Sequence, residues 1–256
     1  MKFRLRIVSI LLLSALSLSA QVLAGKAKLG GSAVFTRAGG AASCTTPCVQ
    51  TPATAYLASS ATVSVSFAAQ PTVGNRIIVT CGTGGSANGF NLPTDNQGHT
   101  YTALMVPLFQ GAAHVNVGIW GTTVATSSGT FTVTCNRPVT EDVQIGIAEF
   151  LPKVSLTTDG TDQNEVDYPS FTGTTLTCGS ITTANADDII LALAIGDLTN
   201  IAPGGAYVQQ ILSAARIGSL ATLIVSSTGT YSPTFTRSDT TGTDYQCVSV
   251  ALHYTP

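Results

Sequence analysis

The sequence predicts an all-β protein folded as a sandwich, and three observations support this. Apolar and polar residues alternate in several runs, such as TVSVSF at 62–67, where the valines share one face and the serines the other. Clusters of Gly, Asn, Asp and Pro interrupt these runs, as turns do between strands. Charged residues make up only 9% of the chain, against about 25% in a typical soluble domain. Surface polarity must therefore come from Thr, Ser, Asn and Gln, which suits strands exposed on one face.

The first 24 residues have the pattern of a secretory signal peptide. Lys2, Arg4 and Arg6 precede the apolar run IVSILLLSALSLSA, and Val22 and Ala24 suit the small-residue positions of a cleavage site. The run is shorter than the roughly 20 apolar residues of a membrane helix. We expect residues 1–24 to be removed, and the rest to be secreted, extracellular or periplasmic.

The charge that remains after cleavage limits the possible partners. The signal contains three of the 11 basic residues, so eight remain against 13 acidic residues, a net charge of −5. Nucleic acid and anionic membranes are bound by basic surfaces. We therefore expect no nucleic-acid partner, and no membrane association once the signal is removed.

All six cysteines follow the signal peptide, and their even number in an exported chain indicates disulfides. They are Cys44, Cys48, Cys81, Cys135, Cys178 and Cys247. They show no Cys-x-x-Cys spacing of the kind typical of zinc sites.

The pairing that we propose is 44–48, 81–135 and 178–247. Cys44 and Cys48 are close in sequence, while Cys81 and Cys135 each end an alternating run on its apolar side. The third pair follows by elimination. It conflicts with the pattern, because Cys247 alternates away from the apolar residues that follow it.

Four segments recur in the same order, which predicts an internal repeat. The pairs are VGNRIIVTCG (73–82) with NADDIILALA (185–194), TYTALMV (100–106) with AYVQQIL (206–212), VATSSGTFTVT (124–134) with IVSSTGTYSPT (224–234), and VQIGIAEF (143–150) with CVSVALHY (247–254). We expect a duplicated β-sandwich domain over 58–256, with copies at about 58–150 and 173–256. Residues 25–57 would form an N-terminal extension. Neither copy is expected to bury its apolar face alone, so the two should pack as one sandwich.

The chain also resembles a known kind of module. The order of TDNQGHTYT (94–102), SGTFTVT (128–134), IAEF (147–150) and TTANADDIILA (182–192) is similar to modules of secreted and surface proteins of soil bacteria and some phages. The resemblance covers about 58–256 and implies a jelly-roll or concanavalin-like sandwich. The shared motifs are turns and strands, so the resemblance concerns fold rather than activity. The six cysteines and the N-terminal extension depart from it.

The acidic pair Asp187–Asp188 is the first candidate for chemistry. In the repeat it takes the places of Asn75 and Arg76, so the shared feature is a polar turn before two isoleucines. Asn and Asp favour turns because their side chains bond to nearby backbone. We interpret the pair as a turn rather than a metal site or an acid–base dyad.

A second acidic cluster lies at the junction between the copies. Its residues are Asp159, Asp162, Glu165 and Asp167. Oxygen-rich loops of this kind bind calcium, but the spacing is not that of an EF-hand. We favour a solvated linker and retain calcium as the alternative. No other cofactor is expected.

Glu149 is the third candidate, because strict alternation would point it inward with Ile145 and Ile147. A buried carboxyl group suggests a general acid, but a glycosidase needs a second carboxylate across a cleft. We favour exposure at the strand end or a local hydrogen bond. Trp120 and the tyrosines could stack on sugar rings if exposed, although burial with the polar tip outward is more usual.

Together these features predict a secreted, non-catalytic surface or extracellular binding module for a glycan or a protein. One alternative is a structural subunit of an extracellular assembly that exchanges its N-terminal segment as a strand. The other is a glycan-active enzyme using Glu149 or the acids at 159–167. The sequence names neither the ligand nor the oligomeric state.

Overall fold

The computed structural model describes most of the chain after Cys44. The described residues are 44–84, 89–105, 116–158, 164–168, 173–196, 201–212, 218–238 and 245–256, with backbone only for 164–168 and 245. All of them belong to one compact unit, residues 32–256. They form antiparallel strands and no helix, which confirms the predicted all-β class. The described ranges accordingly contain no helix that could span a bilayer.

The first half of the chain forms one six-stranded sheet, in the order β1-β6-β2-β5-β4 with β3 also paired to β6. Its strands are β1 (Ala53–Ser66), β2 (Arg76–Thr83), β3 (Thr94–Asp95), β4 (Thr102–Met105), β5 (Asn116–Thr123) and β6 (Thr132–Phe150).

The second half forms another six-stranded sheet, in the order β13-β14-β11-β17-β7 with β8 also paired to β17. Its strands are β7 (Val154–Thr158), β8 (Asn164–Tyr168), β11 (Asp188–Gly196), β13 (Val208–Leu212), β14 (Gly218–Val225) and β17 (Tyr245–Tyr254). Five short strands form two small sheets, β10-β15 and β12-β16-β9. They are β9 (Thr175–Thr177), β10 (Ile181–Thr183), β12 (Ala202–Pro203), β15 (Gly229–Tyr231) and β16 (Thr234–Thr236).

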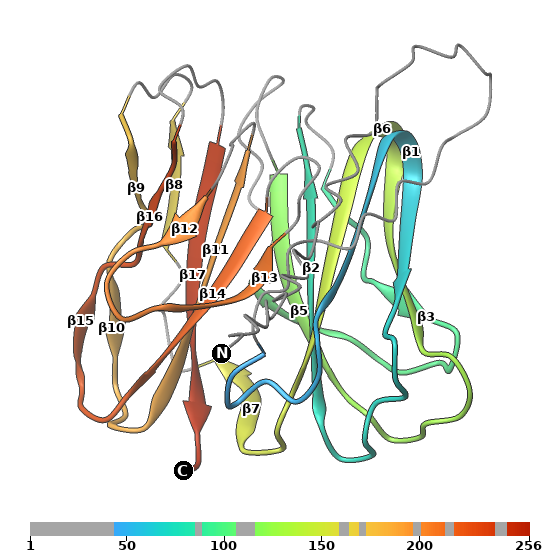
Figure 1. The fold of residues 1–256 in the computed structure, drawn as a ribbon, viewed down its shortest axis with the longest axis horizontal. Helices are drawn as coiled ribbons and strands as arrows, with labels where there is room; N and C mark the ends of the chain where they lie inside the picture. Colours follow the sequence, from blue (N-terminus) through green and yellow to red (C-terminus); the bar gives the residue numbers. More distant parts are fainter. Residues whose placement is uncertain are drawn as a thin grey trace, which may run out of the picture. The chain divides into compact units, whose positions relative to one another are not determined.

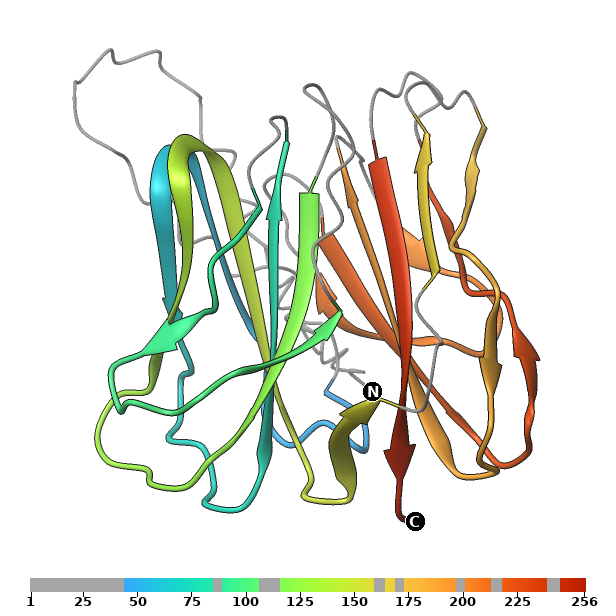
Figure 2. The same ribbon diagram turned by 180° about the vertical axis from the view of Figure 1, so that it is seen from behind.

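The two large sheets pack face to face, as a β-sandwich requires (Figure 1 and Figure 2). A shared core between them takes residues from both, including Ile78 and Ile119 from the first sheet and Ile189 and Leu220 from the second. Each large sheet comes from one half of the chain. These strand orders do not establish the jelly-roll connectivity implied by the resemblance.

Each half also has a core of its own, on the far side of its large sheet. In the first half that core includes Ile77 and Trp120. In the second half it includes Leu176 and Phe235, from the small sheets. The two halves bury their inner faces against each other, as expected, but each buries its outer face by itself, which was not expected. The sequence contains the signal for burial on both faces, because the central strands read as nearly continuous apolar runs rather than alternating ones.

Double-sided burial also affects the sequence alignment of the two copies. That alignment places Ile77 opposite Ile189, yet Ile77 lies in the core of its own half and Ile189 in the shared core. Matching the faces requires a shift of one residue, because a one-residue slip turns every side chain of a strand to the other face. Alternation cannot fix the register of a strand that is apolar on both sides.

Strands begin and end at places that differ from the predicted boundaries. β1 starts at Ala53, inside the expected extension, and Cys48 forms an isolated bridge with Phe150. β7 and β8 lie in the expected junction and pair with β17. Residues 164–168 are thus an edge strand rather than a linker. Charged residues are common on edge strands because they discourage further pairing.

The structure contains the three disulfides that the sequence suggested. The Cα–Cα distances are 5.2 Å for Cys44–Cys48, 6.0 Å for Cys81–Cys135 and 4.9 Å for Cys178–Cys247. Cys247 does face away from Val248, but the face it occupies is buried too and holds Cys178. The conflict in the sequence pattern is thereby explained. Three disulfides indicate an oxidising compartment.

Candidate functional site

The acidic pair at the start of β11 divides into two different environments. Asp187 lies in the turn, and its carbonyl accepts a 2.8 Å hydrogen bond from the Tyr254 amide. Asp188 is the first residue of β11 and is fully buried, with a carboxylate oxygen 3.7 Å from Nδ1 of the half-exposed His253. The turn that we predicted is present, but the burial of Asp188 was not anticipated.

Glu149 is buried, with 1% of its surface exposed, so the expectation of strand-end exposure is wrong. The expected hydrogen bonding is present, but its donors come from distant parts of the sequence rather than from neighbouring residues. Its carboxylate accepts hydrogen bonds from the Gln50 side chain, from the Thr72 amide at 2.8 Å and from the Asn75 side chain at 2.5 Å. The residue joins the N-terminal segment, the turn before β2 and the end of β6. Its hydrogen bonds hold these three segments together.

Only part of the predicted calcium cluster can be placed. Asp159 and Asp162 lie outside the described residues. Glu165 and Asp167 belong to β8, where their backbones pair with Val248 and Gln246 of β17. Among the described side chains, no group of three or more acidic, histidine or cysteine residues is arranged to hold a metal ion.

A buried network that sequence reasoning missed lies in the turn TDNQGHTY. Asp95 accepts hydrogen bonds from the Gln97 amide at 2.8 Å, the Tyr101 hydroxyl at 2.9 Å and Nδ1 of His99 at 3.1 Å. The strands on either side of this turn do not pair with each other, because β3 pairs with β6 while β4 pairs with β5. The hydrogen bonds of Asp95 hold the turn between them in place.

The network has clear electrostatic consequences. Burial raises the pKa of the Asp95 carboxyl group, but the hydrogen bonds from Gln97, Tyr101 and His99 lower it more, so the pKa lies below its ordinary value. Burial, followed by the negative charge of Asp95, raises the pKa of the Tyr101 hydroxyl far above its usual range. The network therefore holds an ionised Asp95 beside a neutral Tyr101.

His99 in this network is not positioned as a catalytic base. In hydrolase triads the imidazole Nε2 faces the nucleophile while Nδ1–H is held by an aspartate. Here Nε2 accepts a 3.3 Å hydrogen bond from the Thr126 backbone amide. Both imidazole nitrogens are therefore hydrogen-bonded within the chain, and the histidine links the turn to the segment after β5.

Two buried arginines form a second feature that sequence reasoning missed. Arg137 and Arg237 are each 4% exposed. Arg137 donates to Thr83 and, at 3.0 Å, to Glu141, while the Arg237 Nε donates at 2.8 Å to the Gly173 carbonyl. The signal was available, because the ungapped match of 124–134 with 224–234 continues to these two arginines. Buried guanidinium groups need such partners to offset lost hydration.

The aromatic residues do not form an exposed platform in the described part of the chain. Trp120, Tyr101 and Tyr254 are buried, and Tyr207 and Tyr231 are partly buried. Phe90 packs edge-on against Trp120, at 6.1 Å between ring centroids.

The outer layer of the second half presents a regular row of hydroxyl groups, which we call the second-half ladder. It consists of Thr175, Thr177, Ser180 and Thr182 along β9 and β10, and Thr230, Ser232, Thr234 and Thr236 along β15 and β16. Seven of these eight residues are exposed and Thr234 is partly exposed. Their neighbours, such as Leu176 and Phe235, point into the core.

The ladder is paired across the strands. Thr175 lies opposite Thr236 and Thr177 opposite Thr234 in the β9–β16 register. The Ser180 and Ser232 hydroxyls lie 2.8 Å apart. The Thr182 and Thr230 hydroxyls lie 3.1 Å apart.

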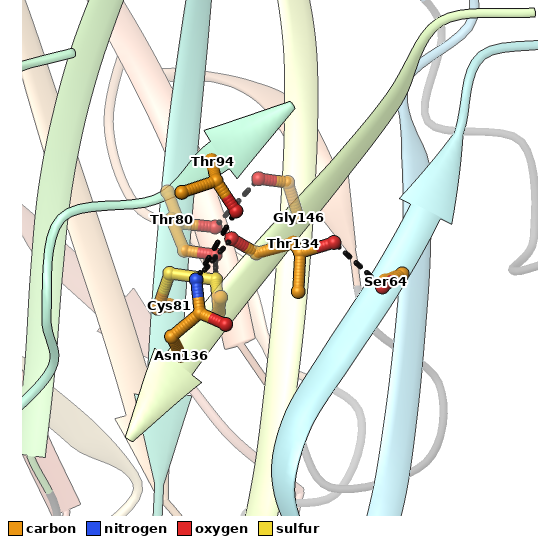
Figure 3. The surroundings of a disulfide bond; sticks show 8 residues. Ser64, Thr80, Cys81, Thr94, Thr134, Asn136 and Gly146 are labelled. Atoms are coloured by element: carbon orange, nitrogen blue, oxygen red, sulfur yellow. Dashed lines mark hydrogen bonds between the residues drawn. A yellow bond between two sulfur atoms is a disulfide. The ribbon is translucent and has the colours of Figure 1, made fainter. Parts of the chain in front are cut away.

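A similar row, the first-half ladder, covers the outer face of β1 and β6. It consists of Thr62, Ser64, Ser66, Thr132, Thr134 and Asn136. The Ser64 and Thr134 hydroxyls lie 2.7 Å apart, in the surroundings of the Cys81–Cys135 disulfide (Figure 3). Asn136 donates to Thr94 of β3, so this ladder is flanked by a third strand.

These arrangements determine what each region can do chemically. The buried acids, His99 and the arginines are engaged in bonds within the chain. The ladders, in contrast, offer uncharged donors and acceptors to the solvent. Comparison with protein-family models, with characterised proteins and with solved structures found no match for this chain. Its function must therefore be inferred from its own geometry.

Proposed function

We propose that the protein is an exported, non-catalytic binding module for an extracellular glycan or protein. The observation that carries the proposal is the pair of hydroxyl ladders, which lie on the outer layers of both halves. A surface that repeats hydroxyl groups over several strands suits the binding of a ligand by many hydrogen bonds rather than by ion pairs.

The engagement of the acidic groups supports a non-catalytic role. A general acid must reach the substrate, but Glu149 is buried under three donors. Asp95 is likewise bonded within its turn, and His99 is bonded to Asp95 and to the Thr126 amide. The glycan-active enzyme is therefore the weaker alternative.

Export through a signal peptide at residues 1–24 is part of the proposal. The three disulfides support it, because such bonds persist in oxidising compartments.

We also infer that the two halves arose by duplication. The strand orders support this: β2 and β11 are central, β5 and β14 lie on one side of them, and β6 and β17 on the other. The terminal strands β4 and β13 correspond in the same way. One disulfide lies within each half, at Cys81–Cys135 and Cys178–Cys247, in addition to the local Cys44–Cys48 bridge.

The alternative of a structural subunit depends on an edge that can accept a strand. β1 is terminal in its sheet. However, the Ser60 hydroxyl bonds both to the amide and to the carbonyl of Thr62, which satisfies part of this strand internally. That contact favours the binding module over strand exchange.

A glycan array combined with a protein-capture screen tests the proposal, with a product assay on every glycan that binds. The proposal expects saturable binding to a ligand without turnover. Binding to neither class, or release of products, would contradict it. Size-exclusion chromatography tests the assembly alternative, which predicts a series of oligomers of increasing size in place of a single species.

A further inference from the structure

We propose that the second-half ladder binds a neutral polysaccharide chain lying along β9–β10 and β15–β16. This inference rests on the proposed binding function and assigns it a surface and a ligand class. The starting observation is that six threonines occupy outward positions of four short strands, and that Ser180 and Ser232, just outside the strand ends, continue the same two rows.

The spacing of the ladder suits a long repetitive ligand. Outward residues of a strand recur about every 6.8 Å, and neighbouring strands lie about 4.8 Å apart. From Thr175 to Thr182 the row extends roughly 24 Å at about 3.4 Å per residue. A surface of this length contacts several sugar units of one chain simultaneously.

The hydroxyl pairs leave bonding capacity for a polyol. Each hydroxyl supplies one donor and two acceptor sites. In a pair such as Ser180–Ser232 or Thr182–Thr230, one donor is used between the partners. The second donor and most acceptor sites remain for hydroxyls of a ligand. Threonine methyl groups between them can pack on the C–H face of a pyranose ring.

Charge selects a neutral ligand over an acidic one. The strands β9, β10, β15 and β16 contain no charged residue. The chain as a whole is acidic, with a sequence pI of about 5.8. An acidic polysaccharide would lose hydration here without gaining an ion pair.

The chemistry of the surface also favours polymers over short sugars. The described aromatic side chains are buried or partly buried. A single sugar ring therefore cannot gain the stacking energy that an exposed aromatic platform supplies. Binding must instead sum many small contacts along one chain. Affinity should therefore rise steeply with the length of the polysaccharide.

The second-half ladder fits this role better than the first-half ladder. In the first half, Asn136 is bonded to Thr94, and Asn96 bonds to the backbone of Thr130 and Thr132, so β3 occupies one flank. In the second half, the flanking strand β12 is Ala202–Pro203 and adds no polar side chain. Its Ala202 carbonyl accepts a 3.4 Å hydrogen bond from the Thr236 hydroxyl of the ladder.

Co-sedimentation of the purified chain with insoluble polysaccharides tests the proposal. The neutral probes are cellulose and starch granules, and the acidic probe is cross-linked alginate. The ladder variant carries Thr177→Val, Thr182→Val, Thr230→Val and Thr234→Val, which removes hydroxyls but keeps shape and strand propensity. A matched serine variant at the same four positions keeps the hydroxyls and removes the methyl groups. Thr102→Val with Thr123→Val, on exposed positions of β4 and β5, is the control.

We expect the unmodified chain and the control to bind a neutral probe at both low and high salt. The valine variant should bind at least about tenfold more weakly, and the serine variant should retain more binding than the valine variant. Folding of each variant is checked by its melting temperature.

Three results would overturn the proposal: equal binding by the valine variant, sedimentation only with alginate, or no sedimentation with any probe. Equal binding by the valine variant would leave the binding function standing and move the site elsewhere. Loss of the binding function itself would appear separately, as a chain that captures nothing on the glycan and protein screens.

Discussion

Glu149 shows what a single buried carboxylate contributes to this fold. It accepts hydrogen bonds from Gln50, Thr72 and Asn75, which come from separate segments. A buried donor that loses its acceptor costs about 1–3 kcal/mol. The residue therefore holds the chain before β1 and the turn before β2 against β6.

Replacing Glu149 by Gln tests this role. The amide presents donors to the donors that surround it, so the free energy of unfolding should fall by about 2 kcal/mol or more in urea denaturation. Asp187→Asn is the matched control, because Asp187 lies in a turn and the change should cost roughly 0.5 kcal/mol or less. An equal effect of the two substitutions would show that the Glu149 hydrogen bonds do not hold these segments together.

The lowered pKa of Asp95 predicts how stability depends on pH. Because the folded pKa lies below the unfolded value, the ionised carboxylate stabilises the fold above about pH 4. That stability is lost as the pH falls through the folded pKa. Asp95→Asn should lower stability at neutral pH and flatten the acid limb of a plot of unfolding free energy against pH. An unchanged acid limb would contradict this.

Sequence reasoning at the scale of residues succeeded for turns and failed for burial. The turn at Asp187 follows from local side-chain chemistry. The burial of Asp188 and Glu149 depends on which segments cover them, and these come from distant parts of the chain. The network of Asp95, His99 and Tyr101 lies within seven residues, but its partner Thr126 does not.

At the scale of elements, the contact between the large sheets depends on glycine. A Cβ atom placed on Gly146 of β6 would lie 2.9 Å from Cγ2 of Ile211 in β13 and 2.8 Å from the Thr80 hydroxyl. The second sheet thus approaches the first too closely for a side chain at this position.

Gly146→Ala should therefore lower the free energy of unfolding by about 1–3 kcal/mol through overpacking. Gly229→Ala is the control, since its added Cβ would meet nothing closer than 3.6 Å. Thermal denaturation of both variants measures the difference. A neutral Gly146→Ala variant would show that the sheets are not in close contact there.

The sequence predicted the type of the long strands but not the layer to which each belongs. Runs such as TVSVSF alternate and were interpreted correctly as strands with one outward face. The central runs around Ile77 and Ile189 are apolar throughout, so a period of two could not show which side faced the shared core. Residues 164–168 were expected to be a linker because their acidic composition resembles one, yet pairing with β17 makes them a strand.

At the scale of the whole molecule, three disulfides and four buried apolar clusters hold the described part of the fold together. We expect a chelator to leave the melting temperature unchanged, if the acids at 159–167 do not bind calcium. Differential scanning calorimetry with and without EDTA measures this. A fall of several degrees that calcium alone restores would make Asp159, Asp162, Glu165 and Asp167 a calcium site.

The central proposal is that the chain is exported, binds an extracellular ligand by its uncharged outer surface and does not transform it. The most direct measurement incubates the purified protein with the neutral polysaccharide that it sediments and follows both bound protein and new reducing ends over time. We predict saturable binding, reduced by the ladder valine substitutions, with no increase in reducing ends. Steady release of reducing ends that Glu149→Gln abolishes in a folded variant would contradict the claim and identify an enzyme.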